Sequence, residues 1–214
     1  MKNTIKPLTL IFIGIQGSGK GTQAEILSEK LGFVFLDTGS RVRSFVKSGK
    51  LPKEDKILTL QGKLIRNETT NRIVLGALSR IPSNKEVIID GYPRSIGQAK
   101  ALVSMLKKTG RIDNYYAVEF KISKKTAYER VLTRLICTKC GKIMGAGDKK
   151  CPCGGKLERR RDDNAEVLAN RLKFVSKNLD AIKAYFRDKK RLVTVNGDQP
   201  RTRVTAEFIK KVKP

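Results

Sequence analysis

The segment 14–20, Gly-Ile-Gln-Gly-Ser-Gly-Lys, is the feature that most restricts how this chain can fold. An apolar run over 8–13 precedes it and predicts a buried strand, and a helical pattern over 22–31 follows it. Glycines let the backbone turn sharply enough to aim its N–H groups at phosphate oxygens. The start of the next helix adds positive potential, and Lys20 reaches the outer phosphates. The segment therefore predicts a phosphate-binding loop of the P-loop NTPase type.

The residue after Lys20 departs from the general form of this loop. Gly21 stands where a Ser or Thr usually holds Mg²⁺, and the hydroxyl comes one place later, at Thr22. We therefore expect Mg²⁺ to be held through water and not by that hydroxyl.

Short apolar runs alternate with helical patterns along the chain, which predicts an α/β fold. The runs fully apolar on both faces favour a parallel sheet covered by helices on both sides. One late helix is predicted from a single apolar face at spacings of three and four residues. The five expected strands are 8–13, 33–36, 87–89, 116–122 and 192–195, and the apolar face is Leu168, Leu172, Val175, Leu179, Ile182 and Phe186.

Two segments interrupt this alternation. Residues 38–73 are polar and helical in pattern, with no convincing strand, and residues 135–162 are rich in glycine and cysteine with little apolar content. Both are interpreted as insertions on one core domain, which comprises 1–37, 74–134 and 163–214.

Composition restricts the chemistry. Lys and Arg number 46 against 20 Asp and Glu, and the net charge of +26 favours polyanionic partners such as nucleotides, nucleic acid or acidic membranes. With no His in the chain, a His general base, a His-containing triad and His metal ligands are excluded. No apolar stretch approaches the roughly 20 residues that span a bilayer. The apolar run near the N-terminus lacks the cleavage pattern of a signal peptide, so a cytoplasmic protein is expected.

The four cysteines lie within seventeen residues of one another, at 137, 140, 151 and 153. Such clustering indicates a metal site more than a disulfide framework. Four thiolates in a small, glycine-rich insertion favour a tetrahedral structural Zn²⁺, although the second pair has one intervening residue instead of two. The alternative is a set of free or oxidised thiols in an insertion without metal.

Three motifs together resemble the nucleoside monophosphate kinases, and most of all adenylate kinases of the long-lid, metal-bearing type. The segment 17–23, Gly-Ser-Gly-Lys-Gly-Thr-Gln, is similar to that family's phosphate loop. The segment 90–94, Asp-Gly-Tyr-Pro-Arg, resembles its Asp-Gly-Phe-Pro-Arg element. The segment 160–163, Arg-Arg-Asp-Asp, followed by Arg171, resembles its lid-closing stretch. The resemblance implies that 38–73 is the NMP-binding insertion, that 135–162 is the lid, and that ATP and AMP are converted to two ADP with Mg²⁺.

The resemblance also implies roles for individual residues. Asp90 would orient the waters on Mg²⁺, Asp162 and Asp163 would pair with lid arginines on closure, and Met144 occupies the position of an aromatic that covers adenine. The residues implied to bind ATP are Gly17, Ser18, Gly19, Lys20, Gly21, Thr22, Arg130 and Gln199. Those implied to bind AMP are Thr38, Gly39, Arg43, Lys63, Ile65, Gly91, Arg94 and Gln98. Those implied to act on the transferred group are Lys20, Asp90, Arg94, Arg130, Arg134, Arg160 and Arg171.

Alternatives stay open from the sequence. Ser40 stands where the family usually has Asp, which removes one carboxylate expected near the Mg²⁺ waters. The acceptor could be UMP or CMP, although Thr38 matches the adenylate kinase pattern. A basic nucleic-acid-binding zinc protein with a nucleotide site is the alternative from another class. We expect ATP, AMP and ADP as partners of a monomer, with no nucleic acid and no membrane.

Overall fold

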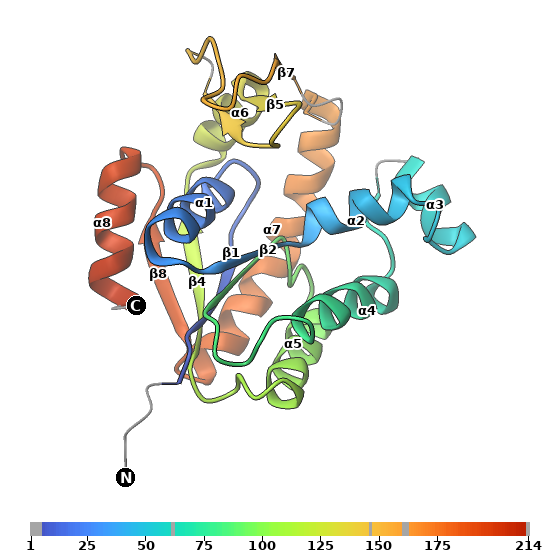
Figure 1. The fold of residues 1–214 in the computed structure, drawn as a ribbon, viewed down its shortest axis with the longest axis vertical. Helices are drawn as coiled ribbons and strands as arrows, with labels where there is room; N and C mark the ends of the chain where they lie inside the picture. The colour runs from blue at the N-terminus through green and yellow to red at the C-terminus, as the bar shows by residue number, and fades with distance from the viewer. Residues whose placement is uncertain (1–5, 61–62, 146, 160–162, 213–214) are drawn as a thin grey trace.

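The computed structural model describes residues 6–60, 63–145, 147–159 and 163–212 (Figure 1). Its centre is a five-stranded parallel sheet in the order β2-β3-β1-β4-β8. Each predicted strand is present within one residue at either end, which confirms the α/β fold. The strands are β1 (Thr9–Ile13), β2 (Val34–Asp37), β3 (Val87–Asp90), β4 (Tyr115–Lys121) and β8 (Leu192–Asn196).

Helices cover both faces of the sheet, because neighbouring residues of a strand point to opposite sides. On one face Leu10 and Ile88 pack with α1 (Lys20–Leu31) and α8 (Arg201–Val212). On the other face Ile11 and Ile89 pack with α4 (Asn67–Leu78), α5 (Ile96–Lys108) and α7 (Ala165–Asp188). In Figure 1 the two groups of helices lie on opposite sides of the strands.

The predicted apolar face of α7 is confirmed, and it serves two neighbours. Ile182 and Phe186 are buried in the sheet core, whereas Leu168 and Leu172 pack against α6 (Lys124–Thr133) and the phosphate loop. One long helix therefore connects the sheet with the part of the molecule below the cysteine-rich insertion. None of the described helices has the length and low polarity needed to cross a bilayer.

The first insertion is helical, as predicted. It contains α2 (Thr38–Lys47), α3 (Lys53–Leu60) and the start of α4, around a small core of Leu51, Ile65 and Ile73. The fully buried Asp55 accepts a hydrogen bond from the backbone N–H of Arg66 at 2.9 Å. The predicted boundary at residue 73 falls inside α4, whose later residues join the sheet core.

The second insertion contains three short strands that its low apolar content did not predict. β5 (Leu135–Cys137) lies between β6 (Ile143–Met144) and β7 (Leu157–Glu158), and both pairings are antiparallel. Lys142 places its Nζ 2.9 Å from Glu29 Oε1 on α1. This insertion, called the lid below, therefore contacts the helix that follows the phosphate loop.

Candidate active site

A cavity of about 1310 Å³ opens where the carboxyl ends of β1, β2 and β3 meet. Its walls come from the phosphate loop, both insertions, the segment after β3, and α6 and α7. Residues predicted for both nucleotides line this one space. They are Gly17, Ser18, Gly19, Lys20, Gly21, Thr22, Gly39, Arg43, Lys63, Ile65, Asp90, Gly91, Arg94, Gln98, Arg130, Arg134 and Gln199.

The phosphate loop wraps around the amino group of Lys20. Lys20 Nζ donates to the backbone oxygens of Gly14 at 2.9 Å and Ile15 at 2.8 Å, and to Ser18 Oγ at 3.0 Å. Gly17 has a φ of +85°, and a Cβ there would lie 2.9 Å from the backbone oxygen of Ala127 on α6. The tight turn and the packing of α6 thus both require glycine at this position.

Burial of the Lys20 amino group lowers its pKa to about 8. The nearby Asp90 carboxylate acts in the opposite direction, and Arg94 and Arg134 lower the pKa further. These four side chains are therefore close enough to influence one another electrostatically. They come from α1, β3, the loop after β3 and the end of α6.

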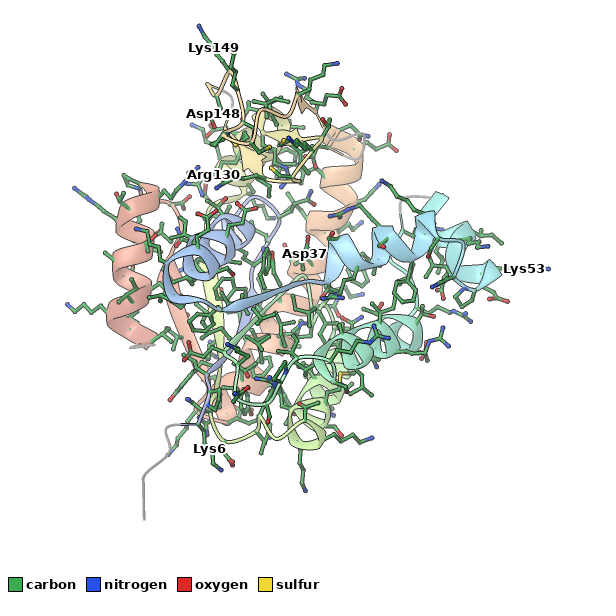
Figure 2. The ribbon with its side chains drawn as sticks, in the orientation of Figure 1. Lys6, Asp37, Lys53, Arg130, Asp148 and Lys149 are labelled. Atoms are coloured by element: carbon green, nitrogen blue, oxygen red, sulfur yellow. The ribbon has the colours of Figure 1, made fainter. Side chains whose placement is uncertain are left out.

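Asp90 ends β3, as the sequence predicted, and its Oδ1 accepts the N–H of Gly91 at 2.7 Å. Burial raises the pKa of Asp90, Lys20 lowers it, and Asp37 raises it. Asp37 ends β2 and is the register partner of Asp90. Figure 2 shows Asp37 at the junction of β2 and α2. Sequence reasoning missed this residue, although two neighbouring parallel strands that each end in Asp place their carboxylates at the same edge.

Two arginines enter the cavity on the side of the first insertion. Arg94 Nε donates to the backbone oxygen of Gly91 at 2.8 Å, and Arg43 Nη2 lies 3.6 Å from Asp37 Oδ2. Guanidinium groups bind phosphate oxygens through paired N–H donors. These two arginines therefore suit the cavity to a second phosphate, in addition to those held by the phosphate loop.

Gln98 lines the same cavity and is 5% exposed. Its Oε1 accepts the backbone N–H of Arg94 at 2.7 Å, and its Nε2 donates to Asn67 Oδ1 at 2.8 Å. Lys63 and Ile65 of the first insertion also line the cavity. Asn67 was not predicted, because a polar residue at the start of a helix is ordinary.

Arg130 and Arg134 both line the cavity. Their spacing of four residues in the sequence predicts that both lie on one face of a helix, and this prediction is wrong. α6 ends at Thr133, and Arg134 is the cap residue with extended backbone, φ −67° and ψ 151°. The chain leaves the helix there because it enters β5 at the next residue. Figure 2 shows Arg130 just below the lid.

Arg134 forms a two-pronged ion pair with Asp163. Its Nε and Nη2 donate to the two carboxylate oxygens at 2.6 and 2.7 Å, and both side chains are largely buried. Gln16 of the phosphate loop also donates to Asp163, at 3.3 Å. Asp163 therefore connects the hinge of the lid with the loop, a contact that the sequence did not reveal for Gln16.

Some predicted residues lie elsewhere. Arg160 and Asp162 are outside the described residues, and the side chain of Arg171 in α7 is also outside the described part. Thr38 does not line the cavity; its hydroxyl is buried and, among the described residues, has no hydrogen-bond partner. Gln199 lines the cavity and donates to Glu207 of α8. The roles of these residues stay predictions.

The four cysteines come together in the lid. Their sulfur atoms all lie within 4.8 Å of one another, and Cys137 and Cys151 are buried. Neighbouring sulfurs are 3.4 to 3.5 Å apart, close to the roughly 3.8 Å expected around a tetrahedral zinc with Zn–S of about 2.3 Å. The backbone N–H groups of Cys140 and Lys139 lower the pKa of Cys137 to about 6, whereas burial and hydrogen bonds with the neighbouring thiols raise the pKa of Cys140 and of Cys151.

Matching turns explain why the shorter second pair still fits. The N–H of Gly141 bonds to the carbonyl of Cys137 at 2.9 Å, and the N–H of Gly154 bonds to the carbonyl of Cys151 at 2.8 Å. The second turn is one residue shorter, as is the spacing of its cysteines. A Cβ at Gly155 would collide with Cys137 Sγ, so glycine is needed beside the cluster. The donor set fits a structural metal.

Comparison with known proteins identifies a family. The family model described as adenylate kinase matches residues 12–191. An adenylate kinase of Thermosipho melanesiensis is 35% identical, over 96% of this chain and all of its own length. Those of Petrotoga mobilis and a Geobacillus strain are each 34% identical, over 94% of this chain and 95% and 96% of their own lengths. The chain therefore belongs to the adenylate kinase family.

Proposed function

We propose that this protein transfers the γ-phosphoryl group of ATP to AMP in the reversible, Mg²⁺-dependent reaction ATP + AMP ⇌ 2 ADP. One observation carries the proposal. A single cavity is lined both by the phosphate loop and by Arg43, Arg94 and Gln98. Two nucleotides can lie in it with their phosphates facing each other across Lys20.

The donor ATP would lie on the loop side. Backbone N–H groups of 17–22 and the start of α1 would hold its phosphates. Arg130 and Gln199 would line the rest of its path, and Met144 of the lid would cover the base. The acceptor AMP would lie on the other side, with its phosphate between Arg43 and Arg94 and its base near Gln98 and Ile65.

Phosphoryl transfer needs correct positioning and positive charge around the transferred group, with little covalent work by the protein. Lys20, Arg94 and Arg134 supply that charge from three directions. Arg134 uses Nε and Nη2 for Asp163, so its remaining nitrogen, Nη1, is the one to approach a phosphate. The ion pair fixes the plane of the guanidinium before substrate arrives. Arg160 and Arg171 would add charge from the far side.

Mg²⁺, when bound, would supply positive charge that offsets part of the negative charge of the donor phosphates. Asp90 is suited to hold its waters, because a buried carboxylate at the end of β3 faces the loop beside Lys20. Asp37 stands beside Asp90 and adds a second carboxylate. These oxygen donors match the preference of Mg²⁺ for carboxylates and water.

We also propose that the lid holds a structural Zn²⁺ on Cys137, Cys140, Cys151 and Cys153. Four sulfur ligands leave no open position for catalysis. The lid has little apolar area of its own, so the metal would supply its order. A reducing cytoplasm keeps such thiols available for zinc.

Closure of both insertions over the substrates completes the mechanism. The segments 38–73 and 135–162 would exclude water, which would otherwise hydrolyse ATP. We also propose that the protein acts as a monomer.

A coupled assay that offers AMP, CMP, UMP and GMP separately tests the function. We expect phosphorylation of AMP at the highest kcat/KM. Indifference to AMP would overturn the proposal, and a preference for UMP or CMP would reassign the acceptor. Wild-type protein with Lys20→Met as the matched control separates the protein's own activity from a contaminating kinase.

A further inference from the structure

The amide group of Gln98 is held in one orientation by two hydrogen bonds of opposite kind. The backbone N–H of Arg94 donates to Oε1 at 2.7 Å, and Nε2 donates to Asn67 Oδ1 at 2.8 Å. A side-chain amide has two N–H donors and two acceptor lone pairs. After these two bonds, the amide of Gln98 has one N–H left on Nε2 and one lone pair left on Oε1.

That remaining pair matches one kind of base edge. Adenine presents an amino donor beside a ring-nitrogen acceptor, which complements the acceptor and donor of Gln98. Guanine and hypoxanthine present a carbonyl acceptor beside an N–H donor, the reverse arrangement. To bind them, Gln98 would have to turn its amide so that Nε2 faces the backbone N–H of Arg94. The N–H groups of Gln98 and Arg94 would then face each other, and neither would have an acceptor there.

Asn67 and its neighbour on α4 hold Gln98 from a second direction. Asn67 is the first residue of α4, and Asn71, four residues later, lies on the same helix face. Tyr92 Oη lies 2.6 Å from Asn71 Oδ1 and 3.1 Å from the backbone oxygen of Gln98. One helix thus contacts the side chain of Gln98 directly and its backbone through Tyr92.

We propose that Asn67 is a specificity-determining positioning residue, which fixes the amide of Gln98 so that the acceptor site selects a 6-aminopurine over a 6-oxopurine. The inference rests on the proposed function, because it assumes that the acceptor base reaches Gln98. Asn67 acts through Gln98 and needs no contact with the phosphates. Asn67 lines the cavity at the start of α4, next to Gln98, where the base of the proposed acceptor would lie.

The test compares AMP with IMP, two acceptors that differ only at this base edge. Asn67→Leu removes the acceptor at nearly equal size, whereas Asn67→Asp keeps an oxygen that can only accept. We expect Asn67→Leu to reduce the AMP-to-IMP ratio of kcat/KM by about tenfold or more, mainly through the KM for AMP. The KM for ATP should not change, and Asn67→Asp should keep the wild-type ratio or increase it.

Controls separate this role from a general structural one. Arg72→Gln changes an exposed residue of α4 outside the cavity and should leave the ratio unchanged. If Asn67→Leu does not fold, Asn67→Ala is measured by the same ratio. A ratio within twofold of wild type for the variant without the acceptor overturns the inference, as does an equal loss in Asn67→Asp. Wild-type protein that fails to use AMP would instead overturn the proposed function.

Discussion

Asp37 and Asp90 are register partners at the carboxyl ends of the neighbouring strands β2 and β3, and both line the cavity. The charge of Asp37 raises the pKa of Asp90, so the two carboxylates are close enough to interact. Ser40, which stands where the family pattern has Asp, is exposed and does not line this cavity. The chain therefore has a carboxylate three residues earlier than expected, beside the residue that would hold the Mg²⁺ waters.

Replacing Asp37 tests whether this carboxylate serves the metal. We expect Asp37→Asn to weaken Mg²⁺ binding in the nucleotide complex by about tenfold, the usual effect of losing a group that orients metal-bound water. Mn²⁺ titration of the protein–ATP complex by electron paramagnetic resonance measures this directly. Ser40→Ala is the matched control and should leave the affinity unchanged. Equal Mn²⁺ affinity in Asp37→Asn and wild type would mean that Asp37 serves only to pair with Arg43.

The pKa of Lys20 predicts how nucleotide binding depends on pH. Lysine is charged below its pKa, so the charge that holds phosphate is present at neutral pH and is lost as the pH rises through about 8. We expect the Kd for ATP to increase about tenfold between pH 7 and pH 9, by calorimetry, because binding requires the protonated amine. In Lys20→Met the binding of ATP should be weak, and its Kd should be nearly independent of pH.

The stability of the folded protein, in contrast to its affinity for ATP, should increase as the pH rises above about 8. The pKa of Lys20 is lower in the folded protein than its ordinary value of 10.5, so between the two values the unfolded chain binds more protons. Its contribution therefore makes the free energy of unfolding rise with pH from about 8 toward 10.5. Comparison of urea denaturation of wild type and Lys20→Met isolates this contribution. A wild-type stability that falls relative to the variant would contradict the buried, pKa-lowered lysine.

The sequence was sufficient for the core fold because that part depends on local patterns. The apolar strands, the glycine-rich turn and the apolar face of α7 each carry their own signal within a few residues. The strands of the lid carry none, since β6 and β7 are each two residues long and mostly polar in context. They pair with β5 in the structure, next to the cysteine cluster and its two glycine turns.

The site was predictable only where a motif marks a residue. Lys20, Asp90 and Arg94 lie in such motifs, and the cavity brings them together. The sequence alone could not identify three other residues, because each contacts a partner far away in the chain. They are Asp37 beside Asp90, Asn67 bonded to Gln98, and Gln16 bonded to Asp163. The error over Arg134 arose because spacing alone does not show where a helix ends.

The ion pair of Arg134 and Asp163 predicts both a stability and an activity effect. The two side chains are 14% and 2% exposed, so removal of one partner leaves a largely buried charge unpaired. We expect Asp163→Ala to lower the free energy of unfolding by about 3 kcal/mol and kcat by at least about tenfold. Glu158→Ala removes the exposed pair with Lys156 and should cost less than about 0.5 kcal/mol. Equal effects of the two substitutions in urea denaturation would show that the buried pair of Arg134 and Asp163 stabilises the fold no more than the exposed pair does.

The cysteine cluster predicts one zinc per chain and a lid that loses its order without it. Elemental analysis of purified protein should give about one zinc, and removal with a strong chelator should lower Tm and kcat together, because the metal supplies order that the lid's apolar area cannot. Cys151→Ser, at a buried ligand, should abolish stoichiometric zinc, and Lys150→Ser next to it should retain it. Fewer than about 0.2 zinc per chain in wild type, with unchanged Tm after chelation, would mean that the four thiols stabilise the lid by contact alone.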